Sequence, residues 1–271
     1  MNRAILLGTG GIAVAFGMLA FGYLAGDRQV AIAQDRGVVE MASAEGLTKG
    51  DVETIVREYL LANPELLLEI QEALDTKQKE EQKIAQLDII NGARAEIFNA
   101  TYDAVVGNPN GKVTIVEFYD YNCGFCKRAF EDMQKLTAQD PELRFVLKEF
   151  PILGPDSQKA HQVSQAFHRL MPEKYGEFHN ALMTGHGRAS EATAIKVAVD
   201  LGADEAKLRE EMKSPDITEV FNKTYELANK LSITGTPSYV VGNEVVFGAL
   251  GYEVLAEKIK LAEACIADAT C

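Results

Sequence analysis

The chain has 271 residues, of which 47% are hydrophobic, and it carries a formal net charge of −13. This length and apolar content suffice for one substantial domain with accessory segments. The negative charge argues against a surface that neutralises phosphates, so we expect no nucleic-acid partner.

An uncharged apolar segment opens the chain and runs from Ala4 to Ala25, after Arg3. It is longer than the core of an ordinary signal peptide and reaches the ~20 residues that span a bilayer. Ala31-Ile32-Ala33 offers a small-x-small cleavage site further on. The sequence therefore predicts export. Residues 1–33 are either a cleaved signal peptide, which we favour, or an uncleaved membrane anchor with a short tether.

Residues 34–99 are predicted to form a tether and then a helical arm. The apolar positions of the first helix have amphipathic spacing: Val52, Ile55, Val56, Tyr59 and Leu60. A second helix follows the Asn63-Pro64 break and continues to Asn91, with an apolar beginning and a charged middle. We expect the apolar base of this arm to associate with other copies of the chain. The alternative is that residues 52–74 pack on the main domain.

Residues 100–271 are predicted to form a second, mixed domain. Strands are expected at Val113–Asp120 and Arg144–Phe150, with a helix after the first. Between about 154 and 231 every signal is helical. A hairpin follows, with strands Ser238–Val241 and Glu244–Phe247 and a turn at Gly242-Asn243, and a final helix runs from Tyr252 to Ala267. The histidines of the helical block are expected to be surface or packing residues: His161, His168, His179 and His186.

Cys123-Gly124-Phe125-Cys126 lies between the first strand and its helix. Two thiols with this spacing can close a small disulfide ring, and a helix N-terminus lowers the pKa of the first thiol. Half of a zinc site has the same spacing, but Cys265 and Cys271 are wrongly spaced to complete it. We therefore favour a redox pair and expect no metal. Cys265 and Cys271 are expected to form a local structural disulfide, with an intermolecular pair or a second redox centre as alternatives.

This order of elements resembles the thioredoxin fold of the DsbA-like thiol–disulfide oxidoreductases, over roughly Ala104 to Ala264. The resemblance implies an α/β thioredoxin fold with an inserted helical domain, preceded by an α-helical N-terminal arm. The arm, Leu47 to Asn91, resembles the oligomerisation arms of the ScsC-like branch of that family, which implies a homo-oligomer.

The resemblance also implies roles for individual residues. Cys123 and Cys126 match the redox-active pair of the family. Gly235-Thr236-Pro237 is similar to its cis-proline loop, which makes Thr236 and Pro237 candidate substrate contacts together with Phe125. Glu117 resembles the buried acid beneath the disulfide, and Lys148 the lysine that pairs with it. A proton-relay role is expected for both, because Val113, Ile115 and Tyr119 share the face of Glu117 and predict its burial.

Gly124-Phe125 departs from the Pro-His pair of the strongly oxidising members and, with Thr236, looks more like the disulfide isomerases. We therefore expect an exported, periplasmic disulfide isomerase or reductase without a cofactor. Its expected partners are cysteine-containing exported proteins and a membrane redox protein. The first alternative is a DsbA-like oxidase that donates its disulfide. The second is a non-catalytic envelope binding protein in which the cysteines form a structural bridge.

Overall fold

The computed structural model describes residues 46–267, which form two compact units that divide between Ala73 and Leu74, inside a continuous helix. The predicted signal or anchor and Cys271 lie outside the described residues, so the Cys265–Cys271 disulfide stays a prediction. The domain bounds expected from the sequence also stay predictions. Over residues 46–267, no helix combines the length and the apolar character that crossing a bilayer requires.

The first unit contains α2 (Lys49–Ala62) and the beginning of α3 (Leu66–Gly92). A capping box starts α2, in which the Thr48 hydroxyl accepts from the Asp51 N–H and the Asp51 carboxylate accepts from the Thr48 N–H. No residue between 46 and 73 is buried, and the large apolar side chains of α2 are 39–71% exposed. This part of the described chain therefore has no core of its own.

The second unit contains a five-stranded mixed sheet in the order β1-β3-β2-β4-β5. Its strands are β1 (Ala104–Gly107), β2 (Val113–Tyr119), β3 (Leu143–Glu149), β4 (Ser238–Val241) and β5 (Glu244–Phe247). β2 and β3 are parallel and are joined by helix α5 (Gly124–Gln139), whereas the other pairs are antiparallel. The hairpin of β4 and β5 has the predicted bounds. The expected α/β fold class is confirmed.

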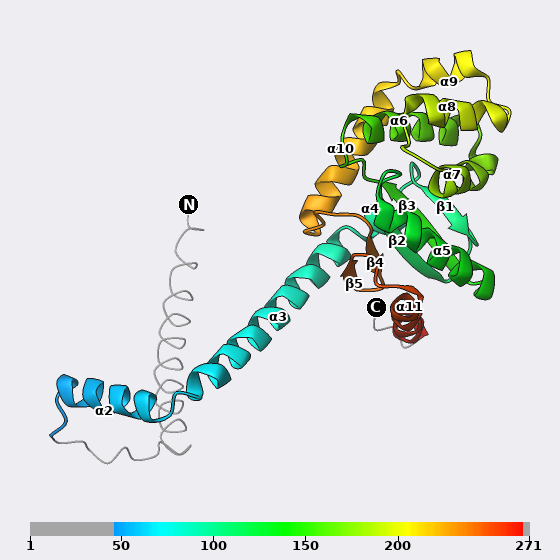
Figure 1. The fold of residues 1–271 in the computed structure, drawn as a ribbon. Coiled ribbons are helices and arrows are strands. Elements are labelled where there is room, and N and C mark those ends of the chain that lie inside the picture. Colours follow the sequence, from blue (N-terminus) through cyan, green and yellow to red (C-terminus); the bar gives the residue numbers. More distant parts are fainter. Residues whose placement is uncertain (1–45, 268–271) are drawn as a thin grey trace, which may run out of the picture. The chain divides into compact units, whose positions relative to one another are not determined.

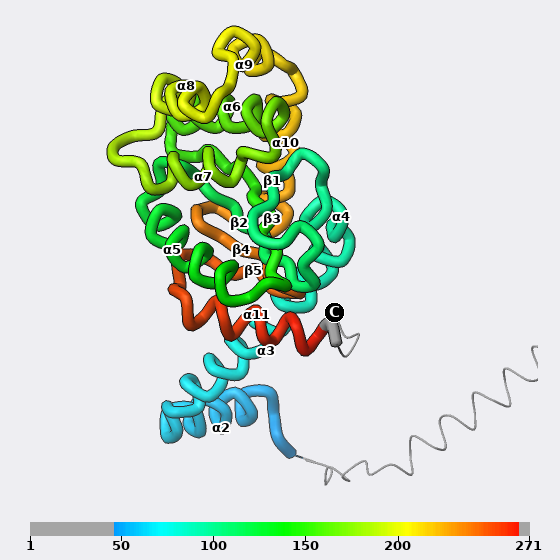
Figure 2. Tube along the Cα trace, turned by 90° about the vertical axis from the view of Figure 1, so that its right-hand side faces the viewer, coloured from blue at the N-terminus to red at the C-terminus, as the bar shows by residue number. Residues whose placement is uncertain are grey.

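Helices cover both faces of this sheet (Figures 1 and 2). On one face, Ile115 and Tyr119 belong to a core shared with α5 and α11 (Tyr252–Ala267). On the other face, Val116 and Phe118 pack with the end of α3, with α4 (Arg94–Phe98) and with α10 (Pro215–Lys230). Successive side chains of β2 therefore enter two different cores, as the strand period requires.

The chain between β3 and β4 is helical, and α6–α9 gather at one end of the sheet (Figure 1). Its first elements are α6 (Pro155–Leu170), the 3-10 turn η1 (Pro172–Lys174) and α7 (Tyr175–Thr184). They are followed by α8 (Glu191–Asp200), α9 (Glu205–Glu211) and then α10. The buried side of α6 contacts the loop that precedes α5, because Tyr121 and Asn122 of that loop hydrogen-bond to α6 side chains.

Candidate active site

The two thiols of the CxxC segment lie at the start of α5. Cys123 is the N-cap residue, and its Sγ accepts from the Cys126 N–H at 3.4 Å. Both cysteines are free thiols. Cys123 keeps 6% of its surface exposed, whereas Cys126 is completely buried. Of the pair, only Cys123 therefore offers its surface to an incoming disulfide.

The surroundings of the two sulfurs separate their acidities. The Cys126 thiol contributes most to lowering the pKa of Cys123 to about 5, and the Thr236 side chain and nearby backbone N–H groups add to it, against partial burial. Burial raises the pKa of Cys126 well above its ordinary value, and Cys123 and the charge of Glu117 raise it further. At neutral pH Cys123 is therefore a nucleophilic thiolate, whereas Cys126 keeps its proton.

The loop before β4 lies against Cys123. The Thr236–Pro237 peptide bond is cis, and Cys123 Sγ lies 3.2 Å from the Thr236 carbonyl oxygen, to which the thiol donates in its protonated form. The Gly248 N–H donates to the Pro237 carbonyl oxygen at 2.9 Å, which ties this loop to the end of β5. Phe125 is 57% exposed, and the Arg128 guanidinium lies 4.3 Å from its ring centroid. The fold thus brings Thr236 and Pro237 to Cys123 and leaves the Phe125 ring on the surface.

Glu117 is 1% exposed and points into the same core as Ile115 and Tyr119. It lies directly opposite Tyr239 of β4, but its Oε1 and the Tyr239 hydroxyl are both buried without a hydrogen bond of ordinary geometry among the described residues. Burial raises the pKa of Glu117 to about 8, although the Tyr239 hydroxyl opposes the rise. A carboxyl group with this pKa, coupled electrostatically to Cys126, can exchange a proton near neutral pH.

The predicted pairing of Lys148 with Glu117 is wrong. In the parallel register of β2 and β3, Glu117 is level with Leu147, and Lys148 is level with Phe118. The Lys148 side chain therefore enters the opposite face of the sheet, where its Nζ donates to the Asp103 carboxylate and to the Glu96 carbonyl oxygen. Lys148 is completely buried, and this buried ion pair is separated from the thiols by the sheet.

Sequence reasoning missed Tyr239 and the side chains that hold the loop before Cys123. The available signal for Tyr239 was its place two residues after Pro237 in a short apolar strand, which makes it a buried polar group near the cis-proline loop. The side chains around the loop come from the helical insertion, and no sequence spacing connects them to Cys123. His161 and His179 are buried. Within residues 46–267, no group of three or more His, Cys, Asp and Glu side chains is arranged to hold a metal ion.

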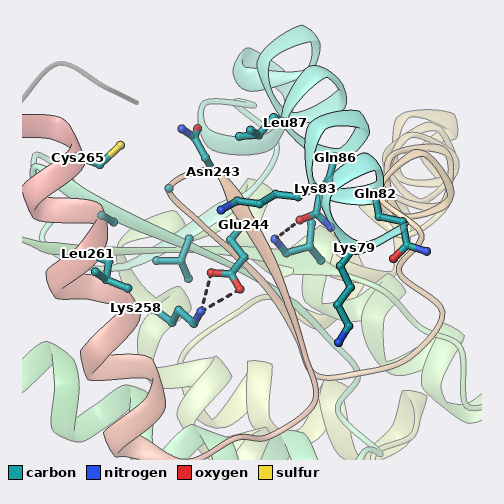
Figure 3. A pocket seen from close by; sticks show the side chains of 14 residues that line it. Lys79, Gln82, Lys83, Gln86, Leu87, Asn243, Glu244, Lys258, Leu261 and Cys265 are labelled. Atoms are coloured by element: carbon teal, nitrogen blue, oxygen red, sulfur yellow. Dashed lines mark hydrogen bonds and ion pairs between the residues drawn. The ribbon is translucent and has the colours of Figure 1, made fainter. Parts of the chain in front are cut away.

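A groove of about 680 Å³ lies elsewhere in the second unit, between α3, the β4–β5 hairpin and α11 (Figure 3). Lys79, Lys83 and Lys258 line it, and Lys258 is paired with Glu244. On its floor the Val245 N–H donates to the Gln86 side chain at 3.2 Å. Neither Cys123 nor Cys126 lines this groove, so it is separate from the candidate active site.

Comparisons with known proteins agree with this geometry. The family model of the DSBA-like thioredoxin domain matches residues 114–260, and that of the copper resistance protein ScsC N-terminal domain matches residues 49–81. Disulfide bond formation protein D of Bacillus subtilis is 25% identical over 166 residues, which are 58% of this chain and 75% of that protein. The chain also matches the Na(+)/H(+) antiporter NhaA 3 of Salinispora tropica at 24% identity, but spans only 24% of the antiporter's length.

Two solved structures extend the likeness. A thioredoxin-like oxidoreductase from Silicibacter pomeroyi has a TM-score of 0.60 and 38% identity, and the match covers 63% of this chain and 98% of that one. Proteus mirabilis ScsC in a transitional conformation has a TM-score of 0.60 and 28% identity, with coverage of 82% and 99%. The match to Proteus mirabilis ScsC covers more of this chain than the match to the thioredoxin-like oxidoreductase, so it extends beyond the thioredoxin domain. The chain therefore belongs to the DsbA-like thioredoxin domain family of thiol–disulfide oxidoreductases, and it carries an N-terminal segment of the ScsC type.

Proposed function

We propose that this chain is an exported, periplasmic thiol–disulfide oxidoreductase that acts on protein disulfides as an isomerase or reductase. The proposal is carried by one observation, the thiolate-favouring site of Cys123 at the start of α5. This sulfur is the more exposed of the pair, its pKa is lowered to about 5, and it lies against the cis peptide of Pro237.

The reaction begins when the Cys123 thiolate attacks one sulfur of a substrate disulfide. The substrate S–S bond breaks, a mixed disulfide forms with Cys123, and the second substrate sulfur leaves as a thiolate. As an isomerase, the protein holds this mixed disulfide until another substrate thiolate displaces Cys123. The substrate then has a rearranged disulfide, and neither partner is oxidised or reduced overall.

As a reductase, the protein uses Cys126 to resolve the mixed disulfide. The Cys126 thiol loses its proton and attacks the Cys123 sulfur, which breaks the mixed disulfide and releases the substrate sulfur that was bonded to Cys123 as a thiolate. The substrate gains two electrons, and the Cys123–Cys126 pair becomes a disulfide. Glu117 is proposed to accept the Cys126 proton in its ionised form. Formation of the mixed disulfide favours that form, because it removes the Cys123 charge that helps to raise the pKa of Glu117, and Glu117 is electrostatically coupled to the Cys126 thiol. Lys148 has no part in this scheme because its side chain lies on the other face of the sheet.

Substrates are proposed to be cysteine-containing exported proteins, bound as an extended segment along the backbone beside Thr236 and Pro237. The exposed Phe125 ring offers an apolar contact next to the reacting sulfur. A membrane redox protein is proposed to restore the pair. Self-association through the arm is supported by the match to the ScsC N-terminal domain and by the exposed apolar side chains of α2 and early α3, which no residue of the described unit covers.

A second candidate is a DsbA-like oxidase, and the acidity of Cys123 favours it. A thiolate stabilised to a pKa of about 5 stabilises the reduced pair and makes the disulfide a stronger oxidant. Against this, Phe125 occupies a position where a histidine would add further stabilisation by charge. The reductase gives two electrons to the substrate, the oxidase takes two electrons from it, and the isomerase transfers none overall.

The test is the recovery of activity by a scrambled disulfide-containing enzyme, in a buffer without added thiol after the protein has been reduced. Faster recovery with wild type than with Cys123→Ala supports the isomerase. If recovery is equal but oxidised protein restores activity to a reduced substrate, the oxidase is the correct function. Inactivity of wild type in both assays, with Cys123 unreactive to alkylation after mild reduction, refutes both and leaves a non-catalytic binding protein.

A further inference from the structure

The loop Asp120–Asn122 connects β2 to Cys123, and its shape is fixed by hydrogen bonds. The Cys123 N–H donates to the Asp120 carbonyl oxygen at 2.9 Å. The Asp120 carboxylate accepts from the Asn122 N–H and from the Ser157 hydroxyl, each at 2.8 Å. The Asn122 side chain exchanges hydrogen bonds with both backbone groups of Ala189, at 2.7 and 2.9 Å. The helical insertion therefore holds the backbone that leads into the N-cap of α5.

The middle residue of this loop, Tyr121, is held by a buried histidine. His161 of α6 is completely buried, and its Nε2 lies 3.2 Å from the Tyr121 backbone nitrogen. A backbone N–H can only donate, so Nε2 is the acceptor and carries no proton. The proton of the neutral imidazole is then on Nδ1, which donates to Oε2 of Glu149 at 2.8 Å. The two rings also contact each other, with centroids 4.5 Å apart.

Glu149 fixes the orientation of this imidazole. It lies at the end of β3, is 2% exposed, and uses both carboxylate oxygens. Oε2 accepts from His161, while Oε1 accepts from the Ser164 hydroxyl at 2.7 Å and from the Tyr175 hydroxyl at 3.0 Å. Strand β3, helix α6 and helix α7 thus contribute to one buried network whose outermost hydrogen bond reaches Tyr121, two residues before Cys123. A carboxylate that orients a histidine in this way determines which nitrogen is protonated.

We propose that Glu149 and His161 are positioning residues for Cys123, acting through the Tyr121 backbone to hold the sulfur at the N-cap of α5. The inference rests on the proposed function and assigns the helical insertion a part in the thiol chemistry. The Cys126 N–H donates to Cys123 Sγ at 3.4 Å, and this hydrogen bond depends on where the loop places the sulfur relative to the first turn of α5. Neither residue touches the reacting sulfurs.

The experiment compares three full-length variants with wild type in the reduced state. His161→Leu removes the acceptor for the Tyr121 N–H. His161→Gln keeps an acceptor oxygen near the place of Nε2. Val163→Ala is the control, because Val163 is equally buried in α6 and its truncation destabilises the fold without removing a hydrogen bond. The readouts are the pKa of Cys123, from the ultraviolet absorbance of its thiolate, the rate of alkylation, and the melting temperature.

His161→Leu is expected to raise the pKa of Cys123 by about 0.5–1 unit, which is the effect of losing a cap or dipole interaction. His161→Gln is expected to remain close to wild type. Val163→Ala is expected to lower the melting temperature while leaving the pKa of Cys123 unchanged. Should His161→Leu not fold, Glu149→Gln replaces it, since it removes the charge that orients the imidazole at nearly constant volume.

An unshifted pKa of Cys123 in a folded His161→Leu or Glu149→Gln variant overturns the inference and leaves the network a purely structural one. An equal shift in Val163→Ala overturns it as well, because general loosening of α6 would then explain the effect. Neither outcome touches the proposed function, which fails only if wild type itself shows no disulfide exchange. The two failures are therefore distinguishable.

Discussion

Replacing Glu117 by glutamine is expected to change how the stability of the protein depends on pH. The carboxyl group is almost completely buried, and burial raises its pKa from 4.5 to about 8. Between these two values the unfolded chain has ionised the group, whereas the folded chain keeps its proton. The unfolded state thus binds fewer protons, so the free energy of unfolding of the wild type falls as the pH rises through this window. Above about pH 8 both states are ionised, and this fall ends.

At pH 7 the contribution of Glu117 to this fall is about 3 kcal/mol, since each pH unit within the window is equivalent to about 1.4 kcal/mol. Glutamine has nearly the same volume and no ionisation. The difference in unfolding free energy between Glu117→Gln and wild type is therefore expected to move by about 3 kcal/mol in favour of the variant, between about pH 4.5 and pH 7. Only the change of this free-energy difference with pH reports on the ionisation of Glu117, because a difference that is the same at every pH reflects packing.

Urea unfolding at several pH values, with a reductant present, measures the effect. The reduced state is required because the charge of Cys123 contributes to the raised pKa of Glu117. Glu131→Gln is the control, since Glu131 is an exposed carboxylate on α5, and its difference from wild type is expected to stay nearly constant over the same range. If the Glu117→Gln difference is equally constant, Glu117 is not a buried acid of raised pKa, and its proposed proton transfer with Cys126 loses its basis.

Three further outcomes are expected. Alkylation of the reduced protein should be half-maximal near the pKa of about 5 of Cys123, with Cys126 unmodified up to neutral pH; a midpoint above about 8 contradicts the account of the thiolate. Lys148→Met should lower the unfolding free energy by about 3 kcal/mol, because it leaves a buried carboxylate without its partner, while the alkylation rate stays that of wild type. Leu68→Glu should lower the mass measured by light scattering, because it places a charge on the apolar beginning of α3 through which association is proposed. Ile84→Glu, at another exposed position of α3, should leave the mass unchanged. Equal masses for Leu68→Glu and wild type contradict association through the beginning of α3.

Local sequence patterns were enough to predict the position of the thiols and the burial of Glu117. A run of strand residues, a CxxC segment and a helix define the N-cap site without any distant contact. Alternation along β2 is equally local, so the apolar neighbours of Glu117 on the same face were sufficient to predict its burial. The hairpin was predicted to the residue, because its two-residue turn fixes the register of both strands.

The error at Lys148 shows where local patterns stop being sufficient. Glu117 and Lys148 lie on neighbouring parallel strands, and a shift of one residue in their register decides whether the two side chains share a face. No turn fixes the register of parallel strands, since a whole helix separates them. The contact of His161 with Tyr121 was equally inaccessible, because it depends on how the helical insertion packs on the end of the sheet. The resemblance to a family was therefore enough to locate single residues such as Glu117 in the sequence. Which side chains those residues contact could be learned only from the three-dimensional structure.

The two cations of β3, Lys148 and Arg144, have a consequence for engineering. Lys148 donates to the Glu96 carbonyl oxygen and Arg144 to the Phe98 carbonyl oxygen, so the last turn of α4 is fastened to the sheet on the side away from the thiols. The chain segment that leads in from the arm therefore has a fixed attachment point that does not involve the catalytic face. Replacement of the sequence before Leu74, whether by a shorter, a longer or an unrelated oligomerisation segment, should leave the thiol chemistry intact as long as the end of α3 is kept, because Ile90 is completely buried in the core of the domain.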